Sequence, residues 1–263
     1  MNIVRKQVSA VKGGKLAAAV YPAKLLTLTI SDVPGDDPSE IASGPTVGSA
    51  ATAAMALAAL RQWKVVLPDH IMQVITNAPA PIAPNDPRLS TSETRIIAAP
   101  AQSLAAAAQL AGDIDVRILG DAIEGEARNL GQAHAALAMQ IAAEKNTRPV
   151  LLLSGGECTV TRRGNGIGGP NAEYVLAVGH VLNGHPQIHV LACDTDGVDG
   201  AAEVAGAYAG PDMQNLAKAQ RVSSQAALEE NDAHSFFDKI GGQIVTGPTL
   251  TNVNDFRAIL ILP

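Results

Sequence analysis

The sequence predicts an α/β protein with mostly parallel sheets, helices on both faces of those sheets, and two α/β domains. Short apolar runs of strand length alternate along the 263 residues with alanine-rich segments whose apolar residues have helical spacing. Polar clusters directly follow several of the apolar runs, as they do at the carboxyl ends of parallel strands. Aromatic residues make up only 3% of the chain, so the core must be built from alanine, valine, leucine and isoleucine.

The first half of the chain alternates helices and strands. Helices are expected at residues 4–20, 49–63, 69–76, 103–112 and 125–145, and strands at 25–30, 93–98 and 116–119. Pro22 ends the first helix, and residues 78–87 form a loop because four of these ten residues are proline. Residues 146–149 (NTRP) break the next helix, so we place the domain boundary there, giving domains 1–146 and 147–263.

The second half continues the alternation. Strands are expected at 150–153, 158–161, 188–193, 243–246 and 258–262, and helices at 171–182, 213–219, 224–228 and 235–240. A tight Ser-Gly-Gly-Glu turn is expected at residues 154–157, after the first of these strands. Trp63 and the pair Phe236 and Phe237 are expected in the core.

Six glycines fall between Gly155 and Gly169. A glycine loop that leads into a helix is a ready anion site, because free backbone N–H groups and the helix dipole point at one spot. Plain tight turns are the alternative interpretation. Gly164, Gly166 and Gly169 also match the dinucleotide pattern G-x-G-x-x-G. That match is weak, because the preceding residues are polar and no acidic residue follows at the required distance of about twenty residues.

Aspartates gather after the apolar run 188–193. Asp194, Asp196 and Asp199 are hard oxygen ligands of the kind that Mg²⁺ prefers, although turn and cap chemistry uses the same residues. We expect Asp194 and Asp196 to hold a metal and treat Asp199 as a turn residue.

Two further polar clusters flank predicted strands. Residues 249–255 precede the last strand, and there Asn252, Asn254 and Asp255 are suited to bind a carboxylate and a hydroxyl group, or to cap a loop. The third cluster follows the strand at 25–30 and consists of Asp32, Asp36 and Asp37. These three are interpreted equally well as local caps or as site residues.

The charge pattern excludes several partners. The net charge is −6 without a basic block, which argues against nucleic acid and anionic membranes. Arg162 and Arg163, next to the glycine loop, are the local positive charge that an anionic substrate would need. No apolar run approaches 18 residues, and Cys158 and Cys193 are expected as core thiols, so a reducing cytoplasm is the expected location. The histidines show no zinc-ligand spacing.

Four segments together resemble one family. They are SDVPGDDPSEIASGPTV, LLLSGGECTVTRRGNGIGGPNAE, DTDGVDGAAEVAGA and TGPTLTNVND, in that order along nearly the whole chain. They resemble the type II glycerate kinases, which also carry the older name hydroxypyruvate reductase and end in a MOFRL domain. The resemblance implies ATP-dependent phosphorylation of D-glycerate to 2-phosphoglycerate with Mg²⁺. Combining the residue patterns with this resemblance, we assign catalytic roles to Asp194, Asp196, Asn252 and Asp255, and cofactor binding to Ser154, Gly155, Gly156, Glu157, Arg162, Gly166, Gly168 and Gly169.

The resemblance also exposes departures from the family pattern. Family members look longer at the N-terminus, with a Ser-Gly-Gly-Gly turn and a catalytic lysine before the stretch that resembles residues 2–14. The first domain is then expected to be incomplete and turnover to be impaired. Ile167 and Pro170 stand where the family often has arginine. The alternatives are an NAD(P)H-dependent hydroxypyruvate reductase and a non-catalytic ligand-binding remnant, and a homodimer is left open.

Overall fold

The computed structural model describes residues 1–144 and 146–263, which divide into two compact units, Met1–Ala98 and Ala99–Pro263. The division comes earlier in the chain than the boundary expected at residue 146. The physical reason is strand pairing, because the strand at Asp115–Gly120 pairs in parallel with Val150–Gly156 and thereby joins the second unit.

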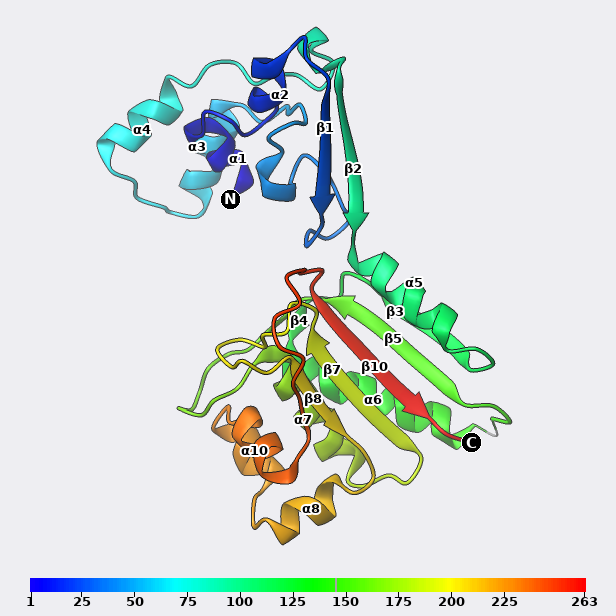
Figure 1. The fold of residues 1–263 in the computed structure, drawn as a ribbon. Coiled ribbons are helices and arrows are strands. Elements are labelled where there is room, and N and C mark those ends of the chain that lie inside the picture. The colour runs from blue at the N-terminus through cyan, green and yellow to red at the C-terminus, as the bar shows by residue number, and fades with distance from the viewer. Residues whose placement is uncertain (145) are drawn as a thin grey trace. The chain divides into compact units, whose positions relative to one another are not determined.

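The first unit contains helices, two strands and two short 3-10 helices (Figure 1). Its elements are α1 (Asn2–Val8), α2 (Lys15–Val20), β1 (Leu25–Ile30), η1 (Ile41–Ser43), α3 (Ala53–Gln62), α4 (Asp69–Thr76), η2 (Pro87–Leu89) and β2 (Ser92–Ala98). The single helix expected at 4–20 is therefore two helices. Gly13 and Gly14 separate them with φ angles of 67° and 80°, which a continuous right-handed helix does not allow.

The first unit has a small core. β1 and β2 pair in parallel from Leu25 opposite Ser92 onward, and the buried apolar cluster of the helices centres on Ala56, Leu60 and Ile75. Trp63 does not join this cluster, because 75% of its surface is exposed, so the expectation of a core tryptophan is wrong.

The second unit holds the rest of the elements. They are α5 (Pro100–Leu110), β3 (Asp115–Gly120), β4 (Gly125–Glu126), α6 (Ala127–Ala143), β5 (Val150–Gly156), β6 (Cys158–Thr159), α7 (Pro170–Leu182), β7 (Ile188–Asp194), β8 (Gly206–Ala209), α8 (Met213–Ala219), α9 (Ser224–Glu229), α10 (Ala233–Ile240), β9 (Gln243–Ile244) and β10 (Asp255–Ile261). The predicted α/β class is confirmed. The strand β8 was not expected from the sequence.

The main sheet of the second unit is mixed rather than mostly parallel. Its strand order is β3-β5-β10-β7-β8-β9, and only the β3–β5 pair is parallel. The last strand, β10, causes most of the difference because it lies between β5 and β7 and runs antiparallel to both (Figure 1, red). Strand direction depends on how the chain returns to the sheet, and the composition of a strand does not record it.

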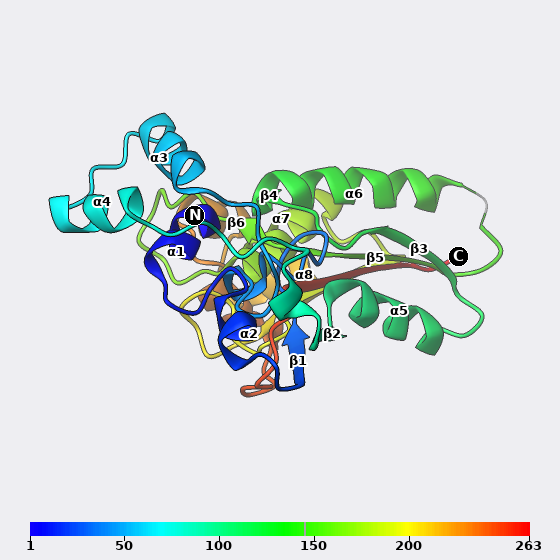
Figure 2. The same cartoon turned by 90° about the horizontal axis from the view of Figure 1, so that it is seen from above.

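Helices cover both faces of this sheet, as predicted. α5 lies on one face and α6 on the other, and the two are seen on either side of the sheet in Figure 2. α7 packs beside α6, where a Cβ on Gly131 would come within 2.8 Å of the Tyr174 carbonyl oxygen. The core consists mainly of the expected small and aliphatic side chains, together with Tyr174, Phe236 and Phe237. No helix in the part of the chain that the structure describes is long and apolar enough to cross a membrane.

Candidate functional site

Three of the predicted polar segments meet at one end of the main sheet. Asp255, the first residue of β10, lies opposite Gly156 of β5 on one side and Asp194 of β7 on the other. The antiparallel direction of β10 places its N-terminal end beside the C-terminal ends of its two neighbours. The polar loop before β10 therefore reaches this end directly, without having to fold over it.

Ser154, Gly155 and Gly156 lie within β5 and do not form the expected turn. Ser154 is buried, and a Cβ on Gly156 would overlap the backbone of Ile123. The amide of Ile123 in turn donates a hydrogen bond of 3.0 Å to the Gly155 carbonyl. The two glycines therefore admit a neighbouring chain segment, whereas Glu157, which follows, is exposed.

The acidic turn after β7 is held by its own carboxylates. Asp194 Oδ1 accepts the amide of Asp196 at 3.0 Å, and Asp196 Oδ1 accepts the amide of Val198 at 2.8 Å. Asp196 Oδ2 also accepts a hydrogen bond of 3.0 Å from the side-chain amide of Asn252. The turn is thus joined to the loop before β10, and both aspartates remain partly exposed.

Asp194 has an unusual protonation equilibrium. Burial, reinforced by the neighbouring carboxylates of Asp196 and Asp255, raises its pKa from 3.8 to about 7, although the hydrogen bond from the Asp196 amide opposes the rise. A divalent cation would relieve this repulsion. No group of three or more metal-binding side chains gathers among the described residues, but Mg²⁺ is commonly held by one or two carboxylates plus substrate phosphates. Asp194 and Asp196 fit that smaller ligand set.

Asp255, which was expected to act in catalysis, is bonded within the sheet. It is buried, and its Oδ2 accepts hydrogen bonds from Arg257 Nη2 at 2.6 Å and from the Cys158 amide at 3.1 Å. Its Oδ1 accepts from the Asn171 side chain at 2.6 Å. Sequence reasoning missed Arg257, which also donates to the Gly155 carbonyl and lies over the Tyr174 ring. An arginine within an otherwise apolar strand was the available signal for it.

Asp199 fills the helix N-terminus that the sequence suggested for an anion. Its carboxylate accepts the amides of Asn171 at 2.9 Å and of Ala172 at 2.8 Å, at the start of α7. His234 Nε2 lies 3.1 Å from the same carboxylate, which is fully buried. The protein thus supplies its own anion to α7, and the role of Asp199 goes beyond that of a turn residue.

The glycine loop is packed against the segment before α10. A Cβ on Gly164 would overlap Glu230, one on Gly166 would overlap Asp232, and one on Gly169 would overlap the Asp199 side chain. Gly168 similarly lies against the carbonyl of Asn231. The spacing that resembles a dinucleotide motif therefore serves contacts within the protein. Arg162 and Arg163 remain exposed on this loop.

The third acidic cluster belongs to the first unit. Asp37 Oδ1 accepts the amide of Ser39 at 2.8 Å, which is the local capping that the sequence offered as one interpretation. Asp36 has a φ angle of 53°, as expected for a turn.

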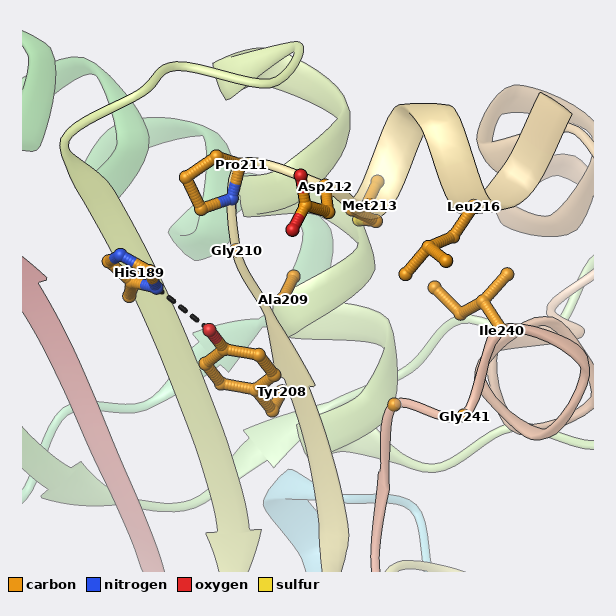
Figure 3. A pocket seen from close by; sticks show the side chains of 11 residues that line it. His189, Tyr208, Ala209, Gly210, Pro211, Asp212, Met213, Leu216, Ile240 and Gly241 are labelled. Atoms are coloured by element: carbon orange, nitrogen blue, oxygen red, sulfur yellow. Dashed lines mark hydrogen bonds between the residues drawn. The ribbon is translucent and has the colours of Figure 1, made fainter. Parts of the chain in front are cut away.

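A separate cavity of about 160 Å³ opens near the other end of β7 (Figure 3). His189 and Tyr208 line one side of it, joined by a hydrogen bond of 2.7 Å, and the rest of the lining includes Pro211, Asp212, Met213, Leu216 and Ile240. None of the residues implied by the sequence lies there.

The comparisons with known proteins agree across the chain. Residues 150–255 match the model described as MOFRL family, and residues 1–76 match a domain of unknown function, DUF4147. The chain is 46% identical to an Agrobacterium vitis protein named "Putative hydroxypyruvate reductase", covering 99% of this chain and 60% of that protein. It is 33% identical to a glycerate kinase of Macaca fascicularis over the whole chain and 78% of that protein.

A solved structure shows the same fold. The glycerate kinase of Thermotoga maritima superposes with a TM-score of 0.89 at 32% identity, covering 99% of this chain and 63% of that one. The chain thus spans about 60% of the length of several relatives. With these matches and the shared fold, the chain belongs to the type II glycerate kinase family.

Proposed function

We propose that this chain takes part in the phosphorylation of glycerate, with ATP as the phosphoryl donor and 2-phosphoglycerate as the product. The observation that carries the proposal is the convergence of the acidic turn 194–198, the loop before β10 and the end of β5 at one end of the sheet. Relatives named glycerate kinase cover the whole chain. Phosphoryl transfer needs positioned charges more than covalent chemistry, and this end of the sheet offers them.

Each residue has a distinct role in this proposal. Asp194 and Asp196 would hold Mg²⁺, which, when bound, neutralises charge on the phosphate groups. Asn252 is exposed beside Asp196, and its amide can bind the glycerate carboxylate or hydroxyl group. Arg162 and Arg163 offer positive charge to the nucleotide phosphates. Asp255 and Arg257 are buried beneath this site, and their hydrogen bonds hold the strand ends in place.

The reductase is the second candidate, because the Agrobacterium vitis relatives carry that name. The contacts of the glycine loop count against it. A dinucleotide site needs glycines open to a pyrophosphate, whereas Gly164, Gly166 and Gly169 lie against residues of the chain itself.

One pair of assays separates the two candidates. The purified chain is given D-glycerate with ATP labelled in the γ-phosphate, and in parallel hydroxypyruvate with NADH. Transfer of label to glycerate supports the kinase, and oxidation of NADH without such transfer would refute it.

Variants test the proposed metal site in the same assay. We expect Asp194→Asn or Asp196→Asn to lower kcat/KM about 100-fold or more, because a lost metal ligand removes charge stabilisation in the transition state. Asp212→Asn is the matched control, since Asp212 lines the cavity near the other end of β7. An equal effect of all three variants would contradict the assignment of the metal site.

A further inference from the structure

We propose that Asn231 is a positioning residue that holds the glycine loop so that Arg162 and Arg163 present their positive charge to a polyphosphate. The proposal rests on the proposed function for the identity of the ligand, the polyphosphate of a nucleotide. It assigns a role to a residue that lies outside every motif noted in the sequence.

One end of the Asn231 side chain accepts two hydrogen bonds from the backbone of the glycine loop. Its Oδ1 accepts the backbone amides of Arg163 at 2.6 Å and of Gly164 at 3.0 Å. The residue is 4% exposed and has a φ angle of 52°, a left-handed conformation that asparagine tolerates better than most residues. The buried side chain of Asn231 therefore holds the backbone that carries Arg162 and Arg163.

The other end of the Asn231 side chain is anchored in a buried ion pair. Its Nδ2 donates to Glu173 Oε2 at 2.9 Å, and Glu173 Oε1 accepts from Arg128 Nη2 at 2.6 Å. Glu173 is fully buried on α7, and Arg128 belongs to α6. Because a buried charge pair with complete hydrogen bonds keeps its geometry, the amide of Asn231 is fixed in one orientation.

The residues on either side of Asn231 accept further hydrogen bonds from the loop. Asp232 Oδ1 accepts the amide of Ile167 at 2.9 Å, and the Glu230 carbonyl accepts the amide of Gly166 at 2.9 Å. The amides of Arg163, Gly164, Gly166 and Ile167 are thus used by the protein. We therefore assign the binding of an anion to the side chains of the two arginines.

The arginines are suited to that task. Both are exposed, and neither forms an ion pair with the residues that the structure describes, although Arg162 Nε donates to the Gly164 carbonyl at 3.2 Å. The other end of the loop lies beside the residue that follows Asp199, because a Cβ on Gly200 would come within 3.2 Å of the Gly168 carbonyl. In a chain with a net charge of −6, two adjacent exposed cations suit a polyphosphate.

The first experiment measures the order of the loop. Asn231→Gly keeps the left-handed backbone but removes the amide, and trypsin should then cleave after Arg162 or Arg163 about ten times faster than in the native chain. Asn183→Gly is the matched control, because Asn183 is also left-handed (φ 47°) but exposed at the end of α7, and it should leave the cleavage rate unchanged.

The second experiment measures anion binding by calorimetry with inorganic pyrophosphate and Mg²⁺. Asn231→Gly and Arg163→Ala should each weaken binding about tenfold, and the double variant should be little weaker than either single one. Non-additivity is the result that a merely structural residue would not produce. Asn231→Asp should also weaken binding, because it sets a carboxylate against Glu173, and adding Glu173→Gln should restore it by reversing the donor and the acceptor.

Three results would overturn the proposal. They are no binding of pyrophosphate by the native chain, unchanged affinity in Asn231→Gly, and additive losses in the double variant. The proposed kinase is judged separately, by label transfer to glycerate. Pyrophosphate binding that depends on Asn231 without such transfer would refute the kinase and leave this inference standing.

Discussion

The two glycine segments of the second unit differ in where they lie and in what surrounds them. Gly155 and Gly156 are buried at the end of β5, where the chain segment 121–123 approaches them. The segment 164–169 lies in a loop between β6 and α7, packed on residues 230–232, with two exposed arginines before it. Both segments use glycine to let protein backbone come close. The second is preceded by exposed cations that an anionic ligand can reach, so the neighbours of a glycine indicate its role better than the glycine itself.

The largest expected effect is on stability and tests whether Gly156 is required for close packing. Gly156→Ala should lower the free energy of unfolding by about 3–5 kcal/mol, because the φ angle of 112° is strained for any other residue and the new methyl group overlaps Ile123. Urea unfolding followed by circular dichroism measures the change.

Gly241→Ala is the control for backbone strain alone. Gly241 has a φ angle of 71°, and nothing lies within 4 Å of the position that a methyl group would take there, so the loss should be only about 1 kcal/mol. Equal losses of unfolding free energy at the two positions would show that the contact with Ile123 does not contribute to the effect.

An intermediate effect is expected for Asp194, beside the first glycine segment, on the pH dependence of stability. Since the pKa of Asp194 is raised to about 7 from 3.8, the folded protein binds a proton more tightly than the unfolded chain does. The resulting stabilisation is complete below about pH 4 and is lost as the pH rises through 7.

Asp194→Asn should remove this pH dependence. The variant should match the native chain near pH 4 and exceed its stability by about 1 kcal/mol at pH 8, a value reduced because solvent screens this partly exposed carboxyl. Thermal unfolding at a series of pH values tests it. A difference in stability between the variant and the native chain that grows toward low pH would contradict the prediction.

The smallest effect on stability is expected in the second glycine segment. Ile167 is 58% exposed, so Ile167→Arg should change the free energy of unfolding by less than about 0.5 kcal/mol. It should nevertheless tighten pyrophosphate binding several-fold, because a third cation joins Arg162 and Arg163. Leu110→Arg, at an 89% exposed position on α5, controls for net charge and should not change the affinity.

Local patterns predicted many elements closely. The strand Leu25–Ile30 and the helices Asp69–Thr76 and Met213–Ala219 begin and end where expected, because prolines, caps and apolar spacing act over a few residues. The meeting of the ends of β5 and β7 was also predictable from the rule that sites gather at strand ends.

Features set by distant parts of the chain were not predictable. The direction of β10, the burial of Asp255 and the contacts of Asp199 all depend on which segments pack together. Asn231 gives no local signal, since an Asn-Asp pair between two helices is typical of any turn. Arginine in the strand β10 was the one visible anomaly.

The position of β10 also has a consequence for how the second unit is made. β5 and β7 come earlier in the chain, yet they are not neighbours in the sheet, because β10 lies between them. Until β10 has been synthesised, those two strands must stay about 10 Å apart or pair wrongly with each other. The centre of the sheet, and with it the meeting point of the acidic turn and β5, is therefore completed only after β10 has been synthesised, which favours slow assembly and leaves the edges of β5 and β7 exposed until then.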